Sequence, residues 1–185
     1  MTMLILGVVL WWAAHLFKRF APGVRAGMGN AGRGAMALVL LVSLVLMVLG
    51  FRAVPAAQNF VTIPGNGHLN NALMLIAVIV FGAGMSKGVL WTKIRHPMLW
   101  GVLLWAVAHL LVHNDVASIV LFGGLGLWAV VEMAVINAAG PWLRPASGGW
   151  KRDAVLIVIA LVMYAIIVAI HVVLGLSPNT GTIYG

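Results

Sequence analysis

The chain alternates between long apolar stretches and short polar segments. The apolar stretches are nearly free of charged residues, and they predict helices at about residues 3–20, 35–53, 69–86, 97–113, 116–138 and 154–176. A helix needs about 20 such residues to cross the roughly 30 Å of hydrocarbon in a bilayer. A membrane barrel would need segments of about ten residues with alternating polarity, which the chain lacks. The pattern therefore predicts an all-α membrane protein, with one six-helix transmembrane bundle over residues 1–185.

The first apolar stretch, Met3 to Phe17, has the length of a secretory signal peptide. Its charges, Lys18 and Arg19, follow the apolar part, whereas the charges of a signal peptide precede it. No cleavage site of small residues follows either. We therefore expect a first membrane helix here.

Composition supports the same class of protein. Hydrophobic residues make up 63% of the chain and charged residues 8%, whereas a soluble domain has about 25% charged residues. The net charge of +8 does not indicate nucleic acid, because the basic residues lie at the ends of the apolar stretches and not on one patch. The absence of cysteine excludes disulfides, iron–sulfur clusters and covalently attached c-type haem.

The basic residues also predict the orientation of the bundle. Ten of the eleven fall in the loops after the first, third and fifth stretches, and Arg52 alone falls in the others. The ten are Lys18, Arg19, Arg25, Arg33, Lys87, Lys93, Arg95, Arg144, Lys151 and Arg152. Positive loops stay in the cytoplasm, so we expect the N- and C-termini on the periplasmic side.

Histidines inside the apolar stretches are the main candidates for chemistry. His15 lies one helical turn after Trp11, and His109 lies one turn after Trp105. A neutral imidazole can bind haem iron through Nε2, and haem b fits between the helices of a bundle. A simpler interpretation is more common, because a lone histidine in a membrane usually makes a helix–helix hydrogen bond. Haem binding therefore requires two imidazoles that meet across a pocket.

Two motifs in the second half of the chain resemble a known family. RHPMLWGVLLWAVAH spans residues 95–109, and LFGGLGLW spans residues 121–128 after a polar break at residues 113–115. Together with the histidine of the first helix, they resemble the NnrU family of bacterial inner-membrane proteins, over the whole chain. The resemblance implies a multi-pass inner-membrane protein that serves nitrite and nitric oxide metabolism in denitrifiers, in connection with nitric oxide reductase.

The same motifs occur in 15-cis-zeta-carotene isomerase, which shares the NnrU-type domain and binds haem b through histidines. By position, the resemblance implies His15 and His109 as axial ligands of haem b, with His96 as the third recurrent histidine. Trp105 and Arg95 belong to the same motifs and are expected beside the cofactor, where Arg95 would pair with a haem propionate. If the chain is an enzyme, the resemblance implies a haem-dependent isomerase or redox enzyme.

The chain departs from the isomerase at two positions. Ala106 stands where the isomerase has a cysteine that can act as a ligand, and Trp128 stands where it has a histidine. The resemblance therefore gives less support to ligand switching and carotenoid isomerisation than to haem binding.

Depth in the membrane leaves other histidine pairs open. His15 lies near the cytoplasmic end of its helix and His109 in the periplasmic half of its own, a gap of roughly 14 Å. Helix tilt can absorb part of this gap. Otherwise His109 would pair with His171 or His68, and His15 with His96.

Two further features have alternative interpretations. Glu132 is the only acid well inside an apolar stretch. It is either a proton relay or haem-edge group, or it pairs with a base such as Arg95 or Lys18. His109 and His113, four residues apart, have the spacing of a metal-binding pair, but a structural role is favoured because Asp115 is the only acid nearby. Gly123, Gly124 and Gly126 are expected to allow close helix packing.

Three functions remain at this stage. The first is a haem-binding factor of nitrite and nitric oxide metabolism, redox-responsive or haem-dependent. The second is a haem-free accessory subunit of a larger complex, such as one containing nitric oxide reductase. The third is a small transporter, for which the side of the bundle with Glu132 and His15 offers the one candidate polar path.

Overall fold

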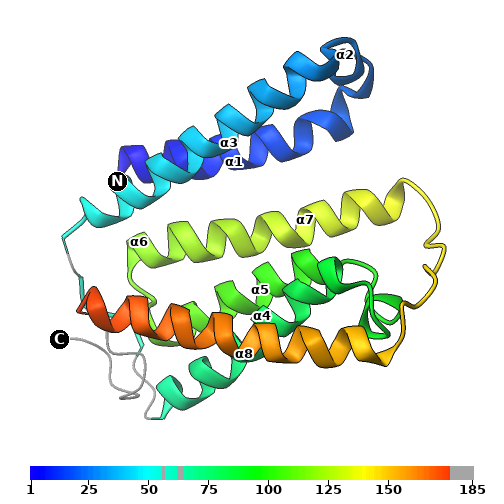
Figure 1. The fold of residues 1–185 in the computed structure, drawn as a ribbon. Coiled ribbons are helices and arrows are strands. Elements are labelled where there is room, and N and C mark those ends of the chain that lie inside the picture. Colours follow the sequence, from blue (N-terminus) through cyan, green and yellow to red (C-terminus); the bar gives the residue numbers. More distant parts are fainter. Residues whose placement is uncertain (56, 62–64, 176–185) are drawn as a thin grey trace.

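The first two long helices form an antiparallel hairpin. The computed structural model describes residues 1–55, 57–61 and 65–175. Helix α1 (Thr2–Phe20) is followed by the short α2 (Pro22–Gly27) and by α3 (Gly29–Arg52), which returns along α1 (Figure 1). The two helices pack closely because Gly50 lies against the backbone of Leu4, and because buried Ser43 donates a 2.8 Å hydrogen bond to the carbonyl of Gly7.

The other long helices form a second group beside this hairpin. They are α4 (Asn66–Ser86), α5 (Pro97–Val112), α7 (Gly124–Ala138) and α8 (Trp150–Val173). Helix α5 packs on α4 where Gly101 faces the backbone of Phe81, and on α7 where Gly126 faces Ala106. Helix α7 faces the α1–α3 hairpin, and Gly124 lies against Val8 of α1 (Figure 1). The close packing expected of Gly124 and Gly126 is thus confirmed, whereas Gly123 meets only Ile119 of its own segment.

The helix predicted over residues 116–138 has three consecutive parts. Helix α6 (Val116–Ser118) passes into a π-helical turn, η2 (Ile119–Gly123), and then into α7. Asp115 caps the start, since its carboxylate accepts hydrogen bonds from the backbone N–H groups of Ala117 and Ser118. A π-helical turn inside an α-helix often marks a functional site.

Several helices begin earlier than their apolar stretches, and the difference is largest for α3 and α8. Helix α3 begins at Gly29 and not near residue 35, and α8 begins at Trp150 and not near residue 154. Their first turns are polar or glycine-rich, so hydropathy alone does not reveal them. The connection between α4 and α5 contains a short 3₁₀ helix, η1 (Leu90–Thr92). At its N-terminus, the carboxylate of Asp153 accepts a hydrogen bond from the backbone N–H of Val89.

The structure confirms an all-helical membrane protein. Among the described residues, five segments are long and apolar enough to cross a bilayer: Thr2–Phe20, Gly29–Arg52, Asn66–Ser86, Val116–Ala138 and Trp150–Val173. Helix α5 is equally apolar, but it has 16 residues, fewer than the usual 20. Much of the outer surface is apolar; Val158 on α8, for example, is 61% exposed. Such a surface is suited to lipid, not to water.

The loops with the basic residues lie at one end of the bundle. In Figure 1, α2, η1 and the connection between α7 and α8 are all at the right. The first residue and the end of α8 are at the left (Figure 1). This arrangement agrees with the charge pattern of the sequence, and the sixth span and the periplasmic termini stay predictions.

Candidate functional site

A stripe of polar and aromatic residues joins α1 to α7. Trp11, His15 and Arg19 follow one another at four-residue spacing on α1, and Trp128 and Glu132 do the same on α7. The His15 ring contacts both indoles, with centroid distances of 4.4 Å to Trp11 and 4.5 Å to Trp128. One turn further along, Arg19 Nε donates to Glu132 Oε1 at 2.9 Å.

Glu132 is a buried acid with a partner different from those expected. Its side chain is 5% exposed, and it pairs with Arg19, not with Arg95 or Lys18. Arg95 instead donates from Nη2 to the carbonyl of Gly140 at 2.6 Å and to that of Ile136 at 3.4 Å. The guanidinium thus sits at the C-terminal end of α7, where a cation stabilises the free carbonyls of a helix.

Three polar atoms in this stripe are buried without a hydrogen-bond partner. They are Nε1 of Trp11, Nε1 of Trp128 and Oε2 of Glu132; the only other such side-chain atom among the described residues is Oδ1 of Asn70. Buried polar atoms are nearly always satisfied by protein, water or ligand. The stripe around His15 therefore offers two N–H donors and one carboxylate oxygen to a bound group.

A second cluster surrounds His109 at the π-helical turn. The His109 ring stacks on Phe122 with a centroid distance of 4.5 Å and an interplanar angle of 21°. Trp105 contacts both rings, at 5.1 Å from His109 and 5.0 Å from Phe122. This cluster places α5 against the segment that precedes α7.

Three histidines inside the long helices share one hydrogen-bond pattern. Nδ1 of His15 lies 3.0 Å from the carbonyl oxygen of Trp11, and Nδ1 of His109 lies 2.9 Å from that of Trp105. His171 makes the same contact with Ile167 at 2.8 Å. A carbonyl oxygen only accepts, so each Nδ1 carries a proton, and in the neutral imidazole Nε2 then carries the lone pair. This is the tautomer that binds haem iron through Nε2.

The structure does not bring His15 and His109 into contact with each other. His15 packs on Trp128 and His109 packs on Phe122, six positions apart along the same segment and so about 9 Å along the axis. His96 lies elsewhere, with its Nε2 2.9 Å from Oδ1 of Asn137 near the end of α7. His68 is exposed in the first turn of α4. The predicted residues thus fall into separate groups.

His113 and Asp115 lie just beyond the end of α5. Burial lowers the pKa of His113, the nearby His171 lowers it further, and Asp115 raises it in part. For Asp115, burial alone raises the pKa, but hydrogen bonds from the hydroxyl and N–H of Ser118 and from the N–H of Ala117 bring it below its usual value. The described residues contain no group of three histidines or acids placed to hold a metal ion.

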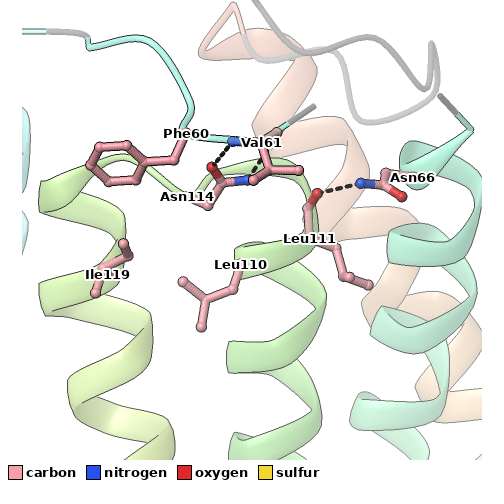
Figure 2. Close-up of a pocket in the computed structure, with 7 residues that line it drawn as sticks. All are labelled: Phe60, Val61, Asn66, Leu110, Leu111, Asn114 and Ile119. Carbon is pink, nitrogen blue, oxygen red and sulfur yellow. Dashed lines mark hydrogen bonds between the residues drawn. The ribbon is translucent and has the colours of Figure 1, made fainter. Parts of the chain in front are cut away.

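The sequence did not indicate a pocket at this same end, shown in Figure 2. Asn114 holds Val61 by two hydrogen bonds of 2.9 and 2.7 Å, and Asn66 donates to the carbonyl of Leu111 at 2.7 Å. The pocket has a volume of about 280 Å³, and the side chains of Phe60, Leu110 and Ile119 complete its mostly apolar lining. The only available signal was the presence of asparagines directly beside apolar stretches.

Nearly the whole chain is similar to one family. The sequence model described as NnrU protein matches residues 3–178. The chain belongs to the NnrU family. No curated protein and no solved structure matches it. The match in this NnrU protein extends over all its long helices, and so over every candidate histidine, Glu132 and the π-helical turn.

Proposed function

We propose that this NnrU protein binds haem b inside its bundle, with His15 and His109 as axial ligands once binding brings together their two clusters, which lie about 9 Å apart along the segment of Phe122 and Trp128. In the bacterial inner membrane it would serve nitrite and nitric oxide metabolism as a redox-responsive or haem-dependent factor, in connection with nitric oxide reductase-related proteins. The observation that carries the proposal is the shared tautomer of the membrane histidines. Each has Nδ1–H fixed to a carbonyl and Nε2 free to bind iron.

The residues around His15 fit such a group chemically. The N–H groups of Trp11 and Trp128 are buried without partners and lie beside His15, where they suit the carboxylates of a porphyrin edge. The rings of Trp105 and Phe122 give His109 an apolar, aromatic surrounding. Bound haem would supply one-electron redox chemistry and a ligand position for small molecules such as nitric oxide.

A second ligand pair has its own support. His171 has the same fixed Nδ1–H as His109. It also acts electrostatically on His113, one turn beyond His109. His109 and His171 therefore form the alternative pair.

One absorption experiment tests the proposal and separates the pairs. The protein is produced in cells supplied with haem precursor and extracted in mild detergent, and a Soret band is expected. His15→Ala and His109→Ala should each remove or strongly shift the band. His68→Ala, the control, should leave it unchanged because His68 is exposed. A band lost in His109→Ala and His171→Ala but kept in His15→Ala would assign the second pair, and stable, colourless wild-type protein would overturn haem binding.

We also propose six spans with periplasmic termini. The distribution of basic residues at one end of the bundle supports this orientation. The chain has no cysteine, so Ser147→Cys and Ala57→Cys each give a single label site. In intact cells, a membrane-impermeant maleimide should label Ala57→Cys and not Ser147→Cys. The reverse pattern would overturn the orientation.

Two haem-free functions remain as alternatives. The buried pair of Arg19 and Glu132 beside His15 is the feature that favours a small transporter. Proton- or anion-dependent flux in vesicles, lost in Glu132→Gln, would assign that function. Copurification of a haem-free chain with nitric oxide reductase would assign the accessory role.

A further inference from the structure

A groove lies apart from both histidine clusters, where the connection between α4 and α5 meets these helices. It has a volume of about 370 Å³ and is lined by Val80, Lys93, Ile94, Arg95, Trp100 and Leu104. It is therefore at the end of the bundle that carries the basic loops (Figure 1).

One end of this groove is positively charged. Lys93 and Arg95 are two of its six lining residues, and no acid lines it. The one ion pair among the described residues, Arg19 with Glu132, involves neither of them. Arg95 is fixed by the carbonyl of Gly140 and has no carboxylate partner among the described residues. The groove therefore attracts an anion, at a position that the rest of the fold has already fixed.

The remainder of the groove is apolar and extends along the helices. Trp100 and Leu104 follow at four-residue spacing on α5, and Leu104 is seven residues, or about 10 Å, beyond Pro97. Val80 lies at a similar depth on α4, six residues before Ser86. Trp100 is 44% exposed, as is common for tryptophan at a membrane–water boundary.

We propose that this groove binds an anionic phospholipid. The lipid phosphate lies against Lys93 and Arg95, and one acyl chain runs along Trp100, Leu104 and Val80. Basic pockets between membrane helices on the cytoplasmic side are suited to anionic headgroups. The groove adds the apolar path that a free anion would not need. The proposal stands without haem binding, because the groove contains no candidate iron ligand.

Thermal unfolding of the detergent-extracted protein tests the proposal. A ligand that binds the folded state raises the unfolding temperature. Phosphatidylglycerol should raise it more than phosphatidylcholine with the same acyl chains. Inorganic phosphate at equal concentration should raise it little. Lys93→Gln should remove most of the difference between the two lipids. The control is Lys151→Gln, an exposed lysine at the same end, and it should retain the difference.

Each possible result of this experiment either supports or overturns the binding of an anionic phospholipid. Equal shifts with the two lipids, or an unchanged preference in Lys93→Gln, would overturn the proposal. An equal shift with inorganic phosphate would indicate an anion site that does not need the lipid chain, and would overturn it as well. Lys93 is used because Arg95 also holds the end of α7. If Lys93→Gln does not fold, Leu104→Gln blocks the apolar path and should weaken the same preference.

Discussion

Arg19 on α1 and Glu132 on α7 form an ion pair in which Nε and Oε1 are 2.9 Å apart. The pair is asymmetric, since the arginine side chain is 29% exposed and the glutamate side chain 5%. The hairpin of α1 and α3 is also tied to α7 by Trp12, whose Nε1 donates to the carbonyl of Gly124 at 3.0 Å. These two polar contacts fix the orientation of the hairpin against the rest of the bundle.

Removal of the arginine should therefore destabilise the protein. Arg19→Ala leaves the carboxylate of Glu132 buried and unpaired, a loss of about 3–5 kcal/mol in the range known for buried pairs. The partial exposure of Arg19 places the expected loss at the lower end of that range. Unfolding in mixed detergent and dodecyl sulfate measures it. Lys18→Ala, a change at an exposed neighbour, is the control. Equal stability of the two variants would show that the pair contributes nothing.

A double variant separates the attraction within the ion pair from the cost of burying an unpaired carboxylate. In Arg19→Ala/Glu132→Gln no buried charge is left, so part of the lost stability should return. A double variant as unstable as the sum of the single variants would contradict this account.

Close packing between α1 and α3 gives a second prediction. A Cβ atom at Gly50 would collide with the backbone of Leu4, and backbone cannot move aside like a flexible side chain. Gly50→Ala should destabilise the protein by about 1–3 kcal/mol, the usual cost of overpacking. Gly34→Ala, on the same helix, meets nothing within 4 Å and should be neutral or stabilising by up to about 1 kcal/mol. The same unfolding assay compares them, and equal behaviour would refute the close approach.

Hydropathy predicted the long helices because burial in lipid requires long, uncharged segments. It could not predict the earlier start of α3, since the segment Gly29–Gly34 is rich in glycine and carries Arg33. The π-helical turn at Ile119–Gly123 was also beyond reach. A change from i→i+4 to i→i+5 hydrogen bonds alters the backbone without changing the apolar pattern.

Sequence spacing contained more information about the site than hydropathy did. Trp11, His15 and Arg19 recur every four residues, so they lie along one face of α1. The same spacing places Arg19 on the face of His15, although Arg95 and Lys18 were the partners expected for Glu132. Which helix faces this stripe is a tertiary property: Glu132 was expected on the same side of the bundle as His15, but Trp128 could not be assigned to the stripe from one sequence. The amide contacts of Asn114 with Val61 were likewise unpredictable, because they join segments 53 residues apart.

The titration of His113 gives a third prediction. Because burial lowers its pKa in the folded protein, the unfolded chain binds the proton more readily. Stability is therefore retained above the ordinary histidine pKa of 6.5 and is lost as the pH falls below it, towards the lower folded value. His113→Gln cannot titrate and should show a shallower loss of unfolding free energy over this range. Identical pH profiles of the two proteins would contradict the burial of the imidazole.

The loop contacts of Asn114 give the last prediction. Its side chain donates to the carbonyl of Val61 at 2.7 Å and accepts from the N–H of Val61 at 2.9 Å, as Figure 2 shows. Asn114→Ala removes both bonds, each worth about 1 kcal/mol, from a segment that Asn59 also holds through hydrogen bonds with the carbonyl of Val112 and the backbone N–H of residue 114. We expect faster amide hydrogen exchange at residues 57–61 and almost unchanged exchange in α1 and α3. Asn70→Ala is the control, because within the part of the chain that the structure describes the Asn70 side chain bonds only its neighbour Asn71. Unchanged exchange at Val61 in Asn114→Ala would show that the segment is held by its apolar contacts with the pocket instead.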